Sequence, residues 1–264
     1  MQRSAAILVI FVSLGFWRVS SGEVPERVVN IQTRPEVTQR FLYLAPEHPR
    51  AAVVLFAGGH GGLEISPKGD LGWGKGNFLV RSRQQFTEQG LSVVVVDAPS
   101  DRQRQAFTGG FRLRPEHVAD IKAVIAWLKQ QASVPVWLIG TSRGTHSAAF
   151  IATQLSVDEG GPDGLVLTST VLQDEKERSV LELPLEKIRV PVLVVHHRQD
   201  ECKNCSYRYI SYLMNKLNNT PRKELITVTG GISRGDACQS FAYHGFNGQE
   251  KEVVGKIAEW VLFK

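Results

Sequence analysis

Two hydrophobic patterns follow one another along the chain. Residues 27–33 and 37–44 alternate polar and apolar positions, which is typical of paired antiparallel strands with one face in water. The later apolar runs are short and nearly continuous, and such strands are buried on both faces. The pattern therefore predicts a parallel sheet between layers of helices. Its strands are expected at residues 51–56, 91–96, 134–139, 164–167, 190–195 and, as an extension, 225–228.

Helical stretches lie between these runs. From Val118 to Leu128 apolar residues recur at spacings of three and four, and Pro115 stands at a favourable first-turn position. The repeated order of strand, helix and strand predicts an α/β fold: a mostly parallel twisted sheet with an antiparallel N-terminal strand pair and helices on both faces. Helices are expected at residues 78–89, 115–131, 145–155, 207–217 and 249–263.

Composition and charge narrow the class of protein. With 264 residues, 42% hydrophobic and 22% charged, the chain can bury one large core, and no repeat or linker divides it. We expect one domain over residues 23–264. The formal charge of +5 becomes +3 without Arg3 and Arg18 of the first 22 residues, which leaves 29 basic and 26 acidic residues. The basic residues are scattered, so no nucleic-acid partner is predicted.

The N-terminus has the layout of a secretory signal peptide. Arg3 precedes an apolar stretch at residues 5–17, and small residues follow it up to Gly22. The stretch is shorter than the ~20 residues that a membrane span requires. We expect residues 1–22 to be a signal peptide cleaved near Gly22, which gives a periplasmic or secreted protein with no stable membrane span. An uncleaved N-terminal anchor is the alternative.

A glycine-flanked serine follows the apolar run at residues 134–139. The sequence Gly-Thr-Ser-Arg-Gly at positions 140–144 stands between this strand and a helix pattern, so it predicts a sharp strand-to-helix turn. Such a turn presents the serine hydroxyl at the edge of the sheet, and its glycines remove side chains that would clash with the crossing backbone. Ser142 is therefore the candidate nucleophile.

Other polar residues follow the predicted strands. Binding sites of open α/β sheets form at the carboxyl ends of the strands, where Asp200 and the loop with His244 are expected. A serine hydroxyl needs an imidazole as base and a carboxylate that fixes the imidazole's tautomer. Asp200 and His244 can supply these groups, and His244 lies in an apolar surround that suits a buried base.

The chain order Ser142, Asp200, His244, together with the serine turn, resembles the α/β-hydrolase superfamily from about residue 51 to the C-terminus. The resemblance implies that Ser142 is the nucleophile, that His244 acts as general base and then acid, and that Asp200 orients it. It also implies an oxyanion hole of backbone N–H groups. Arg143 would give one of them, and either Gly59 or His60 in the Gly-Gly-His-Gly-Gly loop at residues 58–62 would give the other, with Gly59 favoured.

Three cysteines remain, and in an oxidising compartment they indicate one disulfide and one free thiol. A bridge from Cys238 to Cys202 or Cys205 is expected, because it would join the loops of the acid and the base. Cys202 and Cys205 form a C-x-x-C near His196 and His197, so metal or thiol chemistry is an alternative.

Several other residues near the strand ends also have structural interpretations. His60 would make a loop hydrogen bond, His146 would pack in the helix after Ser142, and Asp97 would support the floor of the site. Glu201 is the substitute for Asp200 as the acid, and His196 and His197 would cap the sheet.

The surroundings of the site say less about the substrate. The connection at residues 168–189 is short, which predicts a minimal lid and an open pocket. The arginines in the loop at residues 101–114 are interpreted as side chains of a solvated loop. The alternative is that they attract an acidic substrate. These arginines are Arg102, Arg104, Arg112 and Arg114.

The function predicted from these residues is a serine hydrolase that cleaves a small ester through an acyl-enzyme intermediate, resembling a carboxylesterase. A peptidase or thioesterase with the same triad, and a non-enzymatic hydrolase-like binding protein, are the alternatives. The expected partner is a small-molecule ester. This chemistry requires no cofactor or metal.

Overall fold

The computed structural model describes residues 23–174 and 178–263. The predicted signal peptide at residues 1–22 lies outside these residues. No helix in the described ranges is both long enough and apolar enough to cross a lipid bilayer.

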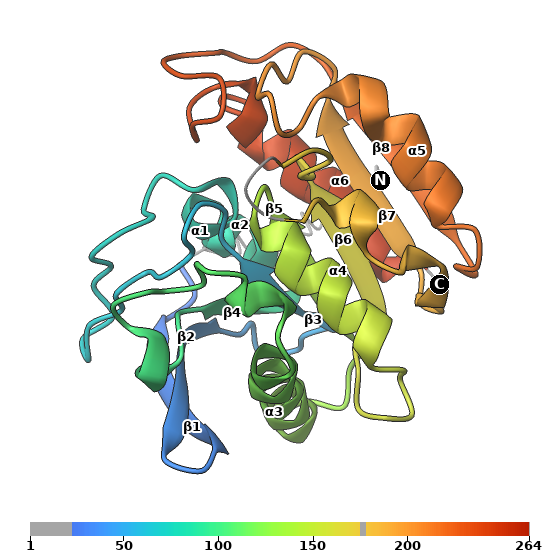
Figure 1. The fold of residues 1–264 in the computed structure, drawn as a ribbon. Helices are drawn as coiled ribbons and strands as arrows, with labels where there is room; N and C mark the ends of the chain where they lie inside the picture. Colours follow the sequence, from blue (N-terminus) through green and yellow to red (C-terminus); the bar gives the residue numbers. More distant parts are fainter. Residues whose placement is uncertain (1–22, 175–177, 264) are drawn as a thin grey trace, which may run out of the picture.

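One sheet runs through the molecule (Figure 1). In the described part of the chain it has eight strands in the order β1-β2-β4-β3-β5-β6-β7-β8. The β1–β2 and β2–β4 pairs are antiparallel, and the other pairs are parallel. The predicted fold class is therefore confirmed. The strands are β1 (Arg27–Arg34), β2 (Val37–Leu44), β3 (Ala51–Phe56), β4 (Leu91–Val96), β5 (Val136–Thr141), β6 (Gly164–Thr168), β7 (Val192–His197) and β8 (Lys223–Val228).

Helices cover both faces of the sheet, because each strand from β3 to β7 presents apolar side chains on both sides. Helices α3, α4 and α5 pack on one face, and α1, α2 and α6 pack on the other. The α-helices are α1 (Phe78–Arg81), α2 (Arg83–Glu88), α3 (Pro115–Gln131), α4 (Gly144–Gln154), α5 (Ile210–Lys216) and α6 (Glu250–Leu262). Short 3₁₀ helices are η1 (Ser100–Arg102), η2 (Phe111–Leu113), η3 (Val180–Glu182), η4 (Leu185–Lys187), η5 (Tyr207–Tyr209) and η6 (Tyr243–Gly245).

Element boundaries differ from the prediction at a few places. The helix expected at residues 78–89 is divided at Ser82, where the backbone adopts φ −95° and ψ 3°. No glycine or proline marks that position. Strand β7 includes His196 and His197, which continue its pairing with β8 although they are polar. Strand β5 likewise extends through Gly140 and Thr141 to the residue before Ser142.

The parallel part of the sheet determines where a site can form. Strands β3, β5, β6, β7 and β8 run in the same direction, so their carboxyl ends lie along one edge. The loops that leave this edge carry the residues singled out from the sequence.

Candidate active site

Ser142 occupies a strained turn between β5 and α4. Its φ is +51°, in the left-handed region that non-glycine residues rarely adopt. Neighbouring backbone leaves no room for side chains on either side of it. A Cβ atom on Gly140 would lie 2.4 Å from the carbonyl oxygen of Gly144, and one on Gly144 would lie 2.1 Å from that of Phe56. The predicted strand-turn-helix setting of the serine is thus present.

The loop after β3 lies beside this turn. Gly59 has a φ of +57°, which glycine adopts without strain, and the Trp73 indole packs against it. The ring of His60 stacks on Trp73 at a centroid distance of 3.8 Å, and its Nδ1 accepts a hydrogen bond from the Gly62 N–H at 3.2 Å. His60 therefore shapes the loop with its side chain.

Asp97, which follows β4, holds the same loop in place. The backbone N–H groups of Leu63 and Glu64 donate to its Oδ1 at 2.7 and 3.2 Å, and that of Ile65 donates to its Oδ2 at 2.8 Å. The carboxylate is buried. These bonds agree with the structural interpretation of Asp97 and fix the far end of the glycine-rich loop.

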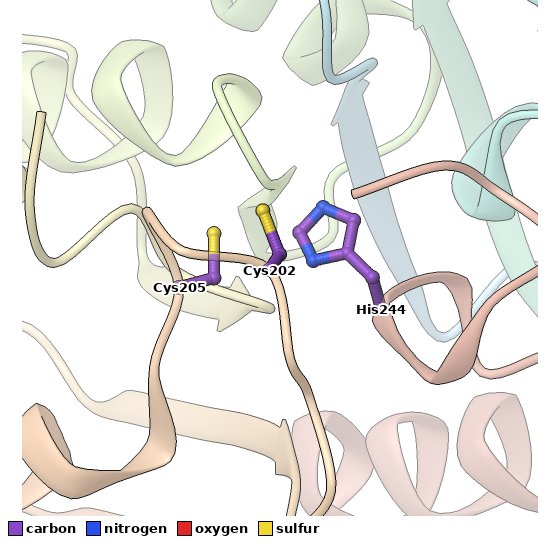
Figure 2. Close-up of side chains that lie close together, drawn as sticks. All are labelled: Cys202, Cys205 and His244. Carbon is purple, nitrogen blue, oxygen red and sulfur yellow. The ribbon is translucent and has the colours of Figure 1, made fainter. Parts of the chain in front are cut away.

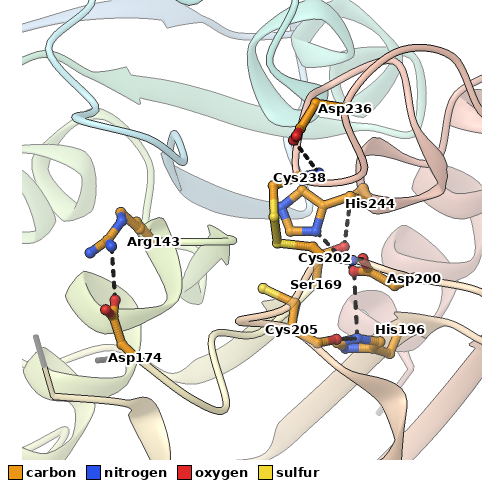
Figure 3. Close-up of a disulfide and its surroundings, with 10 residues drawn as sticks. All are labelled: Arg143, Ser169, Asp174, His196, Asp200, Cys202, Cys205, Asp236, Cys238 and His244. Atoms are coloured by element: carbon orange, nitrogen blue, oxygen red, sulfur yellow. Dashed lines mark hydrogen bonds and ion pairs between the residues drawn. A yellow bond between two sulfur atoms is a disulfide. The ribbon is translucent and has the colours of Figure 1, made fainter. Parts of the chain in front are cut away.

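Asp200 and His244 form a buried pair. Nδ1 of His244 donates to Oδ2 of Asp200 at 2.9 Å, and the N–H of Cys202 donates to Oδ1 at 2.9 Å. The Ser169 hydroxyl donates to the His244 carbonyl at 2.7 Å, which holds the base from the end of β6 (Figure 3). Nε2 of His244 has no hydrogen-bond partner among the described residues.

The protonation of His244 depends on these neighbours. Burial by itself lowers the pKa of His244, but contacts with Cys205 and with the Asp200 carboxylate outweigh burial and raise this pKa above its ordinary value. The surroundings of His244 therefore favour its protonated form.

A small cavity of about 140 Å³ connects the two halves of the site. The nucleophile candidate and the base candidate both line it, whereas His60 does not. A larger depression of about 710 Å³ runs along η4, η5 and α5, but none of the candidate catalytic residues lines it. The smaller cavity is lined by Gly59, Trp73, Asn77, Phe78, Ser142 and His244, among others.

A disulfide joins the loops that carry Asp200 and His244. Cys202 is bonded to Cys238, which selects one of the two predicted pairings, and Cys205 is the free, buried cysteine. Burial raises the pKa of the Cys205 thiol, although contacts with His244 and Ser142 act against it. Cys202, Cys205 and His244 each place a potential metal ligand atom within 4.8 Å of the others (Figure 2). The sulfur atom of Cys202 is bonded to Cys238 in the disulfide, so in this form it is not a free thiol.

The other histidines near the strand ends have partners in the fold. Nε2 of His196 lies 2.6 Å from the Cys205 carbonyl and 3.6 Å from Asp200 Oδ2. His197 stacks on Tyr243 at 4.5 Å. Nε2 of His146 lies 2.6 Å from the Arg178 carbonyl.

Two arginines lie close to the site. The Arg143 guanidinium forms an ion pair with Asp174 at 2.8 Å. Arg112 was expected in a solvated loop, and this expectation is wrong for it. Its side chain is buried and donates to the Ala57 carbonyl at 3.0 Å and to the Ser147 hydroxyl at 2.8 Å.

Sequence reasoning missed two positioning contacts. Ser169 follows a predicted buried strand, which is a recognisable signal, but its bond to His244 spans 75 residues of the chain. Arg81 donates to the Gly245 carbonyl at 2.7 Å and pairs with Glu250 at 2.8 Å, which ties η6 to α1 and α6. No local pattern indicates this second contact.

Comparison with known proteins gives structural matches only. No protein-family model matches the chain, and no curated protein matches it by sequence. A dienelactone hydrolase from Anabaena variabilis matches with a TM-score of 0.64 at 14% identity, covering 91% of this chain and 98% of that one. A Pyrococcus furiosus esterase matches with a TM-score of 0.65 at 14% identity, covering 94% of each chain.

A third similar structure is a lidless α/β serine hydrolase from Xanthomonas campestris. Its TM-score is 0.55 at 14% identity, covering 90% of this chain and 98% of that one. At such identities the likeness concerns the path of the backbone. The strand order, the serine turn and these matches together show that the chain has the α/β-hydrolase fold.

Proposed function

We propose that this protein is an exported serine hydrolase that cleaves small carboxylic esters through an acyl-enzyme intermediate. The observation that carries the proposal is the shared cavity: Ser142 and His244 line it together, and His244 is held by Asp200 at 2.9 Å. The catalytic unit is the domain at residues 23–264, and residues 1–22 serve as the signal peptide. Esterase and hydrolase activities of proteins with this fold add support.

In the proposed reaction Nε2 of His244 accepts the hydroxyl proton of Ser142 as its Oγ attacks the ester carbonyl. The negative oxygen of the tetrahedral intermediate accepts hydrogen bonds from the backbone N–H groups of Gly59 and Arg143. The imidazolium then donates its proton to the departing alkoxide. Water repeats the sequence on the acyl-enzyme and releases the acid.

The assignment of Gly59 rests on its place beside the nucleophile. Gly59 lines the cavity of Ser142, while the side chain of His60 faces Trp73 and Gly62. A cavity of about 140 Å³ suits a short acyl or alcohol group. A thioester or peptide would use the same groups, and the esterases among the similar structures favour an ester.

Export is supported by two observations of different kinds. The first 22 residues have the layout of a signal peptide. The Cys202–Cys238 disulfide is of the kind that persists in oxidising compartments.

A fluorophosphonate probe tests the proposal, because it labels an activated serine without requiring the natural substrate. We expect the mature wild-type chain to be labelled and Ser142→Ala not to be. Ser156→Ala is the matched control, since Ser156 is exposed and its hydroxyl donates to Glu159. Hydrolysis of p-nitrophenyl acetate should fall at least about a thousandfold in Ser142→Ala and persist in Ser156→Ala. Equal labelling of the wild type and Ser142→Ala would disprove the nucleophile.

A further inference from the structure

The free thiol Cys205 lies in an unusual place, next to both a disulfide and the proposed catalytic base. The sulfur atoms of Cys202 and Cys205 and a ring nitrogen of His244 lie within 4.8 Å of one another, and all three residues are buried (Figure 2). Two thiolates and an imidazole form a ligand set that zinc prefers. In the oxidised chain Cys202 is bonded to Cys238, so only one thiol is left to bind metal.

The disulfide can be attacked from outside. Cys238 lies at an exposed position of the loop before η6, whereas Cys202 is buried beside His244. Attack on the Cys238 sulfur would release Cys202 as the leaving thiolate, within the cluster.

We propose that reduction of the Cys202–Cys238 disulfide converts this cluster into a zinc site made by Cys202, Cys205 and His244. A dithiol reductant attacks Cys238, breaks the S–S bond and is then released as its own cyclic disulfide, so two electrons and two protons pass to the cysteines. Zn²⁺ next displaces the protons of the Cys202 and Cys205 thiols and binds Nε2 of His244 in its neutral form, so each thiol releases one proton and a protonated His244 releases a third.

His244 is prepared for such a bond. Zinc-bound histidines generally donate their other ring N–H to a carboxylate, and Nδ1 of His244 already donates to Asp200 at 2.9 Å. Nε2 has no partner among the described residues. The carboxylate therefore orients the lone pair of Nε2 for a metal as well as for a proton.

The required movement is small. Zn–S bonds of about 2.3 Å in a tetrahedral site place two sulfur atoms about 3.8 Å apart. A sulfur and a nitrogen ligand lie about 3.5 Å apart in such a site, so the ligand atoms, now within 4.8 Å, need to approach by about 1.3 Å at most. Cleavage of the disulfide frees the loop of Cys202 to make this shift, and Cys238 or water can take the fourth position.

Zinc at Nε2 would stop ester hydrolysis, because the lone pair that accepts the proton of Ser142 would be occupied. This consequence rests on the proposed function, but zinc binding itself does not. Measuring bound metal and hydrolysis separately therefore distinguishes the two.

The experiment uses the mature chain in its oxidised form and after anaerobic reduction with dithiothreitol followed by desalting. Each form is mixed with ZnCl₂, passed through a desalting column and analysed for zinc by mass spectrometry. We expect about one zinc per reduced chain and almost none per oxidised chain. Co²⁺ in place of zinc should give the near-ultraviolet absorption band of thiolate-bound cobalt.

Two variants locate the site. Reduced Cys205→Ser should bind zinc at least about a hundredfold more weakly, while Asn204→Ser, a change in the same loop, should bind like the wild type. Equal binding by oxidised and reduced chains, or unchanged affinity in Cys205→Ser, would overturn the proposal. So would a reduced chain that loses its near-ultraviolet circular dichroism and does not recover it with zinc.

Hydrolysis supplies the last readout. Zinc bound by the reduced chain with full p-nitrophenyl acetate hydrolysis would exclude His244 as a ligand and overturn the site. If the reduced chain binds zinc but the oxidised chain never hydrolyses esters, the zinc site is supported and the proposed function is disproved.

Discussion

Burial affects the histidines of this chain in different ways. His117 is packed against Phe56, Phe107 and Phe111, and neither of its ring nitrogens has a hydrogen-bond partner among the described residues. Burial lowers the pKa of His117 to about 3. For His244, by contrast, contacts with Cys205 and Asp200 outweigh burial. His244 and His117 thus differ in whether neighbouring groups stabilise the protonated ring strongly enough to offset burial.

His117 makes the stability of the fold sensitive to acid. The unfolded state binds a proton at His117 near pH 6.5, whereas the folded state does so only near pH 3. Between these values the unfolded state binds more protons, so the free energy of unfolding decreases as the pH falls. We expect His117 to contribute about 1.4 kcal/mol per pH unit to this decrease.

Urea unfolding from pH 7.5 to pH 4.5 measures the effect. His117→Phe should retain more of its stability at pH 4.5 than the wild type. His48→Gln, which changes an exposed histidine, should follow the wild-type curve. Parallel pH dependence of the wild type and His117→Phe would show that His117 contributes nothing.

Among the elements, the loop after β3 depends on a residue from the neighbouring strand. Three consecutive backbone N–H groups donate to Asp97, so its carboxylate determines the course of the loop that carries Gly59. An asparagine keeps one acceptor oxygen, but its NH₂ group cannot accept the bond that the Ile65 N–H donates to Oδ2.

Asp97→Asn should therefore lower the free energy of unfolding by about 1–3 kcal/mol. It should also lower kcat for p-nitrophenyl acetate more than it changes KM, because a displaced loop would misplace Gly59, the proposed oxyanion donor. Asp101→Asn removes a carboxylate that pairs with Arg34 at the surface, and both parameters should stay near wild type. A stability loss in Asp97→Asn with unchanged kcat would separate Asp97 from the oxyanion loop.

At the scale of the whole molecule, the disulfide connects two loops that follow different strands. Cys202 and Cys238 are 36 residues apart and lie on the loops of Asp200 and His244. A cross-link of this span restricts the unfolded chain and stabilises the native one by about 3–4 kcal/mol. The same bond holds the loops of Asp200 and His244 together at one end of the sheet.

The double variant Cys202→Ser/Cys238→Ser should lose about this free energy in urea unfolding. Dithiothreitol should lower the stability of the wild type by a similar amount and leave the double variant unchanged. If the reductant destabilised both proteins equally, the effect would not come from this bond.

The sequence predicted the scaffold well because parallel, doubly covered strands have a hydrophobic pattern that few other elements share. It also predicted that Asp200 and His244 meet, since both follow strands that end at one edge. The sequence did not predict contacts between distant segments. The bond from Ser169 to His244 and the approach of Cys205 to His244 depend on loop paths that no local pattern encodes. No local pattern indicates the division of the first helix at Ser82 either.

The crowded turn at Ser142 also bears on how this chain can change over generations. Side chains at Gly140 and Gly144 would collide with backbone, which cannot move aside, so these positions admit a single residue type. Trp73 and Phe78, which line the same cavity, meet His60 and Phe246 through side chains, and side chains can adjust where backbone cannot. Changes in the shape of the cavity beside Ser142 are therefore confined to such side chains, while the turn at Ser142 keeps its two glycines.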